Sequence, residues 1–321
     1  MAGAPSEGRI SWENLVYISD FLKASGENQI ALLGGEPTLH PEIVDFILYL
    51  IEKEFSVTVF TNGILSQSRL QDFKTHLANI DHEKLTFCCN LNDPLLTPAP
   101  KDEQDKIESF LSFMGPRVVP GFNIYRKDFS LDFLFDDINR FGLQRKLRLG
   151  ITHPTPGLDS TYIRTAEIEQ VCKRLYSFRE KFEVFRIKPL LDCGFPVCKF
   201  SDEELGWLLR QGIAQLGCGR APLDIATDLT VIHCFPLSNY RRKSLREFAS
   251  LNQIHDHFSQ MRSQIKSEIA GIYPDCEGCQ HQLSGICTGG GLCQVLVRLI
   301  QEEPVRIAEI NEELAKNRLS A

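Results

Sequence analysis

The chain has 321 residues, of which 43% are hydrophobic, so it can bury a barrel-sized core and still has residues for a smaller second domain. Its formal net charge of −7 argues against a general nucleic-acid binder, because phosphate binding requires a basic surface. It contains no apolar run of about 18 residues and no secretion-signal pattern, so we expect a soluble, cytoplasmic protein that does not associate with membranes. Eleven cysteines in such a chain indicate metal or cluster ligands more than disulfides.

Strand and helix patterns alternate through the first half of the chain. Ser11 is a good N-cap for a first helix, which Gly26 ends. Short apolar runs predict strands at 30–33, 57–60, 85–89, 118–124 and 147–151. Apolar residues at helical spacing predict helices between them at 43–52, 66–78, 102–113 and 131–141. This alternation indicates an α/β fold with a parallel sheet and right-handed crossovers.

The first predicted strand runs directly into the segment Gly34-Gly35-Glu36-Pro37-Thr38-Leu39-His40-Pro41, a strand-to-helix turn. Two glycines permit positive φ or the close approach of a ligand. Glu36 offers a carboxylate at the carboxyl end of the strand, where α/β sheets place their ligands. For Gly-Gly-Glu alone, an ordinary tight turn that ends in an acid is an equally good explanation. The longer string resembles the Gly-Gly-Glu-Pro motif of radical S-adenosylmethionine (radical SAM) enzymes, in which this turn holds the amino group of the bound methionine.

The resemblance implies a partial (β/α) TIM-like barrel. Enzymes of that family carry a C-x3-C-x2-C loop for a [4Fe-4S] cluster on the strand before this turn, whereas the first cysteine here is Cys88. The usual first strand is therefore missing, and the strand at 30–33 has an uncovered edge. We predict that the natural product begins upstream of Met1. The alternative is a degenerate family member that has lost the loop.

Polar residues follow the ends of the predicted strands, on the face where barrel enzymes build their sites. Each alone is more often a turn residue or a surface group; they are Asn62, Asn90, Asn92, Asn123 and Arg148. As a set they resemble the family's contacts to the ribose and carboxylate of S-adenosylmethionine, with Asn90, Asn123 and Arg148 preferred. His153 follows the last of these strands and is a further candidate for the same cavity. Cys88 and Cys89 are adjacent on a strand and point to opposite faces, so we expect core residues and not shared ligands.

The pattern changes after a sixth predicted strand at 182–190. A helix is predicted at 201–216 and a strand pair around Asp228. Eight cysteines fall within 193–293, and C-x2-C spacing lets two thiolates face one metal, while nearby glycines let the backbone wrap a cluster. They are Cys193, Cys198, Cys218, Cys234, Cys276, Cys279, Cys287 and Cys293.

These intervals resemble the SPASM and twitch extensions of radical SAM enzymes, which bind auxiliary [4Fe-4S] clusters. The sequence departs from that pattern at Leu229, where a hairpin glycine is usual, and no cysteine follows Cys293. Eight thiolates suffice for two clusters, but a single cluster and a structural zinc site stay open. His233 and His281 are more easily explained as hydrogen-bonding neighbours than as ligands.

We therefore predict a radical SAM-like partial barrel at 1–190, a cysteine-rich α+β domain at 191–293, and a helical segment at 294–321. The resemblance implies an enzyme that binds S-adenosylmethionine and abstracts hydrogen from a peptide or protein through a 5′-deoxyadenosyl radical, provided that an upstream cluster loop exists. It also implies an electron donor such as a flavodoxin or ferredoxin. The alternative is a non-catalytic iron-sulfur or zinc-binding protein.

Overall fold

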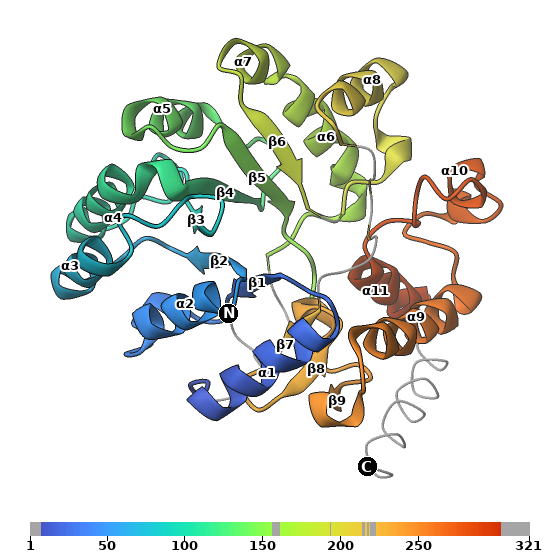
Figure 1. The fold of residues 1–321 in the computed structure, drawn as a ribbon. Helices are drawn as coiled ribbons and strands as arrows, with labels where there is room; N and C mark the ends of the chain where they lie inside the picture. Colours follow the sequence, from blue (N-terminus) through green and yellow to red (C-terminus); the bar gives the residue numbers. More distant parts are fainter. Residues whose placement is uncertain are drawn as a thin grey trace.

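Six parallel strands form one open sheet in chain order (Figure 1). The computed structural model describes residues 8–155, 161–192, 194–213, 216, 218 and 223–302. The strands are β1 (Gln29–Leu32), β2 (Ser56–Thr61), β3 (Leu85–Asn90), β4 (Val118–Ile124), β5 (Lys146–Ile151) and β6 (Lys188–Leu191). Their order confirms the predicted α/β sheet, and β1 and β6 at its two edges leave the barrel open.

Helices cover the outer side of this curved sheet and follow the strands in right-handed crossovers. Each buries an apolar stripe; in the helix at 132–141, for example, the buried residues are Leu134, Phe135 and Ile138. The helices of this layer are α1 (Trp12–Ala24), α2 (Ile43–Glu52), α3 (Gln67–His76), α4 (Lys101–Met114), α5 (Asp132–Phe141), α6 (Ile168–Tyr176) and α7 (Arg179–Val184).

The first strand has an uncovered edge. Among the described residues, β1 pairs only with β2, in the register Gln29↔Ser56 to Leu32↔Val59. Ala31 is exposed and Leu33 is 50% exposed, although strands in a parallel sheet are normally buried. Within the described part of the chain, this edge of the sheet is therefore unpaired.

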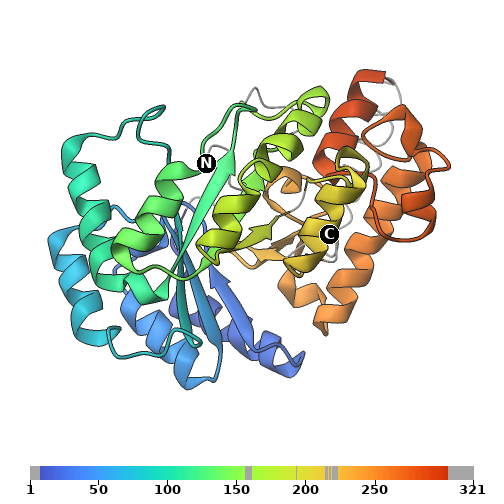
Figure 2. The ribbon, with the colours of Figure 1, turned by 90° about the horizontal axis from the view of Figure 1, so that it is seen from above.

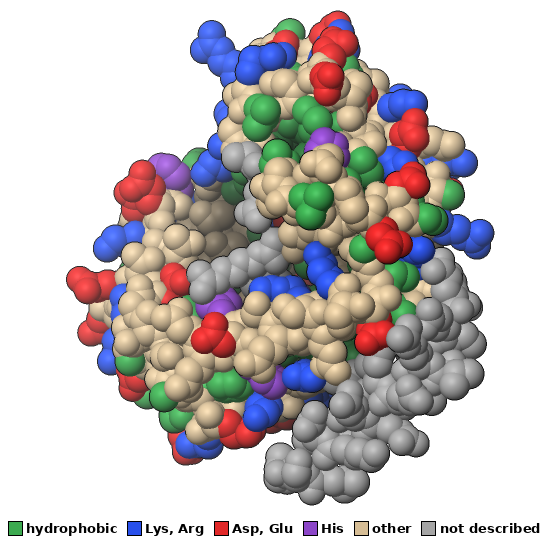
Figure 3. Space-filling view, turned by 90° about the vertical axis from the view of Figure 1, so that its right-hand side faces the viewer, with side chains coloured by type: hydrophobic (Ala, Val, Ile, Leu, Met, Phe, Trp, Pro, Cys, Tyr) green, Lys and Arg blue, Asp and Glu red, His purple; other side chains and the backbone are tan. Residues whose placement is uncertain are grey.

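The C-terminal elements form a second lobe beside the sheet (Figure 2). Basic and acidic side chains are interspersed on the face that this lobe presents in Figure 3. Its elements are a small antiparallel sheet of β7 (Asp224–Ile225), β8 (Thr230–Ile232) and β9 (Lys243–Ser244), and the helices α9 (Leu251–Glu268), α10 (Gln280–Leu283) and α11 (Leu292–Glu302). Helix α8 (Asp202–Arg210) packs on the helices of the sheet (Figure 1), where the centroid of the Trp207 ring lies 5.8 Å from those of Tyr176 in α6 and Phe182 in α7.

The first helix joins the two lobes. The Asn14 side-chain amide on α1 donates to the Thr227 carbonyl, at 2.7 Å, in the turn between β7 and β8. Arg246 lies over the Tyr17 ring, 4.5 Å from its centroid. The backbone N–H of Leu251 donates to the Ser25 hydroxyl.

Two predicted elements were wrong in their extent. The strand predicted at 182–190 is helical through Val184 and extended only from Lys188, because a left-handed residue at Arg186 (φ 52°) separates α7 from β6. The helix predicted at 201–216 ends at Arg210, two residues before Gly212, whose φ is +80°. Of the helical segment predicted at 294–321, residues 303–321 lie outside the described residues. No helix in the described part of the chain combines the length and apolarity needed to cross a membrane.

Candidate functional site

The Gly-Gly-Glu turn lies where β1 ends, and its carboxylate is hydrogen-bonded within the chain. Glu36 caps a short 3₁₀ helix, η1 (Pro37–Leu39), and its Oε1 accepts from Thr38 N at 3.2 Å and Thr38 Oγ1 at 2.7 Å. The same Oε1 accepts from Thr61 Oγ1 at 2.9 Å, and Oε2 accepts from Asn62 N at 2.8 Å. Four donors thus use this carboxylate to join the ends of β1 and β2.

The two glycines of the turn face open space. Gly34 has φ +142°, a conformation that favours glycine, and a Cβ at either Gly34 or Gly35 would meet no atom within 4 Å. Packing therefore does not explain the absence of a side chain at Gly35, whose φ is not positive. A bare backbone is, however, what a ligand that approaches closely requires.

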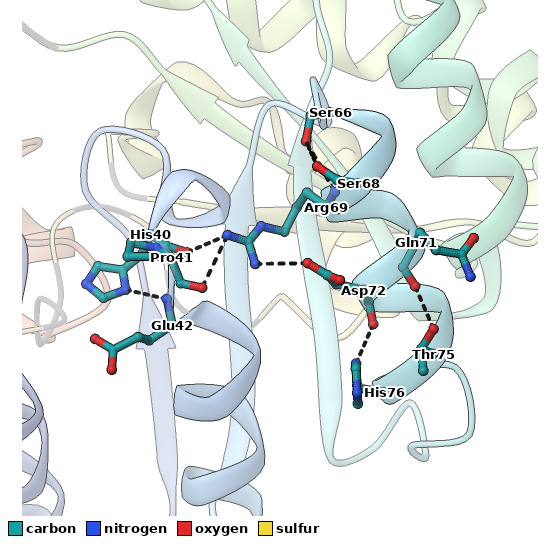
Figure 4. Close-up of polar contacts among 10 residues, drawn as sticks. All are labelled: His40, Pro41, Glu42, Ser66, Ser68, Arg69, Gln71, Asp72, Thr75 and His76. Atoms are coloured by element: carbon teal, nitrogen blue, oxygen red, sulfur yellow. Dashed lines mark hydrogen bonds and ion pairs between the residues drawn. The ribbon is translucent and has the colours of Figure 1, made fainter.

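The far end of the turn is fixed by α3 (Figure 4). The Arg69 guanidinium donates to the carbonyls of His40, at 2.9 Å, and Pro41, at 3.3 Å. His40 Nδ1 accepts from the Glu42 N–H, so its Nε2 carries the proton and donates to the Ile10 carbonyl. The turn is therefore held at both ends, by Glu36 and by Arg69.

A second cluster of polar side chains centres on Arg148 of β5. Its Nη1 donates to Asn90 Oδ1 at 3.3 Å, its guanidinium lies 5.3 Å from the centroid of the Phe60 ring, and it forms an ion pair with Asp192. Asn90 and Arg148 belong to strands on either side of β4, where both are in register with Gly121. A Cβ at Gly121 would lie 2.6 Å from Asn90 Oδ1, so the missing side chain lets these two groups meet.

Arg148 faces a cavity of about 200 Å³ between the sheet and the C-terminal lobe. Its lining includes three cysteines of that lobe and polar groups from the carboxyl ends of the strands. The residues used below are Asn123, Arg148, His153, Asp192, Cys218, Cys234 and Cys293. The structure thus brings Asn123 and Arg148 to one cavity and Asn90 into contact with Arg148, whereas the Gly34–Glu36 turn is not part of the lining.

Burial decides the protonation of several groups here. It raises the pKa of Asp192, against the opposing effect of the Arg148 charge. It also raises the pKa of the Cys88 thiol to about 11 and that of the Cys89 thiol well above its ordinary value. Both thiols are buried in β3, in agreement with a core role.

The C-terminal cysteines fall into two sets. Cys218, Cys234 and Cys293 line the cavity, while Cys193 lies outside the described residues. Cys198, Cys276, Cys279 and Cys287 do not line the cavity. Burial raises the pKa of Cys198, the Lys199 charge lowers it, and the charges of Cys287, Cys276 and Cys279 raise it. The Lys199 ammonium lies 4.3 Å from the centroid of the Tyr273 ring and fixes the segment of Cys198 beside the turn at 274–276.

Small residues surround the second set. A Cβ at Gly271 would lie 2.6 Å from Cys276 Sγ, and the Gly289 N–H donates to Cys287 Sγ at 3.4 Å. Within the described ranges, no three metal-binding side chains are close enough to hold a single ion. One zinc ion requires sulfurs about 4 Å apart, because each Zn–S bond is about 2.3 Å. By the chemistry of their donors, four thiolates fit a four-iron cluster and equally a four-thiolate zinc site.

Sequence reasoning missed Asp192. It follows the strand end at Leu191 directly, so the rule that selected Asn90 also applied to it. The placement of Arg148 at a strand end was wrong, because it is the third residue of β5. Asn62, in contrast, is an exposed turn residue whose Oδ1 accepts from the Ile64 N–H, and Asn92 is exposed.

No known protein-family model and no curated protein sequence matches this chain. Solved structures do. Streptococcus suis SuiB bound to S-adenosylmethionine aligns over 93% of this chain and 69% of its own, with a TM-score of 0.62 and 16% identity. The structure of SuiB bound to the precursor peptide SuiA aligns over 94% of this chain and 69% of its own, with a TM-score of 0.63 and 17% identity. The chain has the fold of SuiB.

A second neighbour with this fold is native anSMEcpe with bound AdoMet (S-adenosylmethionine) and the Kp18Cys peptide. It aligns over 96% of this chain and 92% of its own, with a TM-score of 0.53 and 12% identity. At these identities the likeness shows a shared fold, and function rests on the site.

Proposed function

We propose that this protein is a radical SAM-type enzyme that binds S-adenosylmethionine at the carboxyl edge of its parallel sheet and acts on a peptide or protein. The observation that carries the proposal is the cavity that joins Arg148 and Asn123 to Cys218, Cys234 and Cys293. Neighbours with this fold contain S-adenosylmethionine, and two of the structures also contain a peptide.

Each part of the cofactor has a candidate partner. The Arg148 guanidinium suits the methionine carboxylate, because it offers several donors in one plane. Asn90 and Asn123 offer amides for the ribose. The open backbone at Gly34 and Gly35 suits the amino group, with the Glu36 carboxylate holding the turn in shape.

The C-terminal cysteines would hold the auxiliary [4Fe-4S] clusters. Cys198, Cys276, Cys279 and Cys287 would form one ligand set. Cys218, Cys234 and Cys293 would contribute to the other beside the cofactor cavity. Cys193, which lies outside the described residues, is the remaining thiol that the sequence predicts as a ligand. Such clusters supply electron transfer or substrate ligation when bound. A flavodoxin or ferredoxin as electron donor and a cytoplasmic location complete the proposal.

The radical cluster itself does not fit the residues of this sequence. The C-x3-C-x2-C loop does not occur in it, and Cys88 and Cys89 are buried on one strand. The chemistry implied by the resemblance, reductive cleavage of S-adenosylmethionine and hydrogen abstraction, therefore depends on a loop outside these 321 residues. The same observation favours a second candidate, a non-catalytic iron-sulfur or zinc protein that keeps the fold.

Anaerobic reconstitution separates the two candidates. The enzyme proposal predicts about eight irons per chain if both auxiliary clusters form. It also predicts binding of S-adenosylhomocysteine by titration calorimetry and, in a product carrying the loop, 5′-deoxyadenosine upon reduction. Bound iron without binding of S-adenosylhomocysteine would support the non-catalytic candidate. Stoichiometric zinc without iron would exclude both cluster proposals.

A further inference from the structure

The Arg148–Asp192 ion pair occupies the position at which a ligand carboxylate would bind. Among the described residues that line the cavity, Asp192 is the one carboxylate and Arg148 the one permanent cation. The two side chains are only 37% and 23% exposed, so their attraction is screened less than that of a surface pair. A carboxylate that enters the cavity must compete with Asp192 for this guanidinium.

The remaining contacts of Arg148 do not compete in this way. Asn90 Oδ1 accepts one hydrogen bond at 3.3 Å, and the Phe60 ring lies against the guanidinium at 5.3 Å. Both orient the side chain without neutralising its charge. Asp192 alone neutralises Arg148 within the cavity.

The side chain of Asp192 can move without its backbone. Its N–H donates to the Leu149 carbonyl at 2.9 Å, which fixes the main chain against β5. The carboxylate lies over Gly150, where an added Cβ would be 3.2 Å from Asp192 Oδ2 and 3.4 Å from Asn123 Oδ1. Rotation of one side chain would therefore release Arg148 and enlarge the cavity.

The cavity is smaller than a usual cofactor site, as expected if the Arg148–Asp192 ion pair fills part of it. About 200 Å³ is available, whereas sites for cofactor-sized ligands usually measure about 300–1,000 Å³. The ion pair thus neutralises the charge of Arg148 and fills part of the cavity, and a cofactor with a carboxylate needs both that charge and that space.

We propose that Asp192 is an internal competitor for Arg148, which weakens binding of ligands with a carboxylate and is displaced when such a ligand enters. This inference rests on the proposed function, because it takes Arg148 as the receptor for the methionine carboxylate. Asp192 is thereby a residue that determines specificity, since it sets the affinity for the amino-acid end of the cofactor and not for its nucleoside end.

The test compares two probes, S-adenosylhomocysteine, which has the carboxylate, and 5′-methylthioadenosine, which lacks the amino-acid end. Calorimetric titrations of the reconstituted full chain would use the wild type, Asp192→Asn, and Asp128→Asn as a matched control. Asp128 pairs with Arg126 at 2.5 Å and does not line the cavity. Asp192→Asn should bind S-adenosylhomocysteine about tenfold more tightly, within the usual range of coupling between sites. Its affinity for 5′-methylthioadenosine should change less than about twofold, as should both affinities of Asp128→Asn.

Other results overturn the proposal in distinguishable ways. Weaker binding of S-adenosylhomocysteine alone would make Asp192 an orienting partner of Arg148. Weaker binding of both probes would make it a nucleoside contact. Unchanged binding would remove it from the site. In the double variant Arg148→Gln/Asp192→Asn, the tighter binding of S-adenosylhomocysteine must disappear. A wild type that binds neither probe refutes the proposed function together with this inference. Thermal unfolding of each variant confirms that it is folded.

Discussion

Glu36 joins the ends of β1 and β2 through one carboxylate. Its two oxygens accept from two backbone N–H groups and two threonine hydroxyls. Hydrogen bonds to a charged acceptor are stronger than neutral ones, and a buried donor left without a partner is costly. We expect loss of this acceptor to act first on stability.

Glu36→Gln tests this role. The amide NH2 cannot accept, so at least one donor loses its partner, and we expect the free energy of unfolding to fall by about 1–3 kcal/mol in urea titrations. Glu27→Gln is the matched control, because Glu27 uses only Oε1 to accept from the N–H groups of Asn28 and Gln29. Equal free energies of unfolding for the two variants would contradict the role of Glu36 in holding the turn.

Gly35→Ala tests the open backbone. The added methyl meets no protein atom and φ is not positive, so stability should change by less than about 0.5 kcal/mol. Binding of S-adenosylhomocysteine should weaken at least about tenfold, or 1.4 kcal/mol, because the methyl occupies the ligand's approach. Unchanged affinity in calorimetry would show that the ligand does not approach this turn.

Helix α5 carries an acid in an unfavourable place. Burial raises the pKa of Asp137 to about 6, as do the charges of Glu108 and Asp136, against Arg140. The folded-state pKa lies above the ordinary 3.8, so the group binds its proton more tightly when folded. Its contribution to stability is complete below about pH 4 and is lost as the pH rises through about 6.

Asp137→Asn should therefore raise the melting temperature relative to wild type at pH 7, with a much smaller difference at pH 4. Thermal unfolding across this range measures the effect. The exposed neighbour Asp136 provides the control, since Asp136→Asn should change the pH dependence far less. A rise in melting temperature that does not depend on pH would show that burial does not raise the pKa of the Asp137 carboxyl.

The sheet was predictable from the sequence because each strand is an apolar run bounded by turn residues, as in Val118–Ile124. The segment at 182–190 misled because Phe182 and Ile187 are buried in either conformation, and periodicity alone does not separate a short buried helix from a strand. Pairings such as Arg148 with Asp192 depend on strand register and rotamers, which no local pattern encodes.

In the whole molecule, three of the described C-terminal cysteines line the cavity and four do not. One lines the cavity with Arg148, and the other joins Cys198, before α8, to the segment 276–287. The sequence revealed the eight cysteines, but their division required segments far apart in the chain to be brought together.

Cys198→Ala tests this division. The variant should lose about half of the reconstituted iron, because one four-thiolate set becomes incomplete. Iron analysis and visible absorption measure the loss. Cys89→Ala is the control, since Cys89 is buried in β3 and burial raises its pKa well above the ordinary value. Full iron content in Cys198→Ala would exclude this residue from the set.

The hydrogen bond between Asn14 and the Thr227 carbonyl joins residues 213 positions apart. A ribosome adds about 5–20 residues per second, so α1 waits roughly 10–40 s before its partner in the second lobe has been made. During synthesis the face of α1 that carries Tyr17 has no lobe to cover it. The same helix that unites the finished molecule therefore stays partly uncovered until the second lobe has been made.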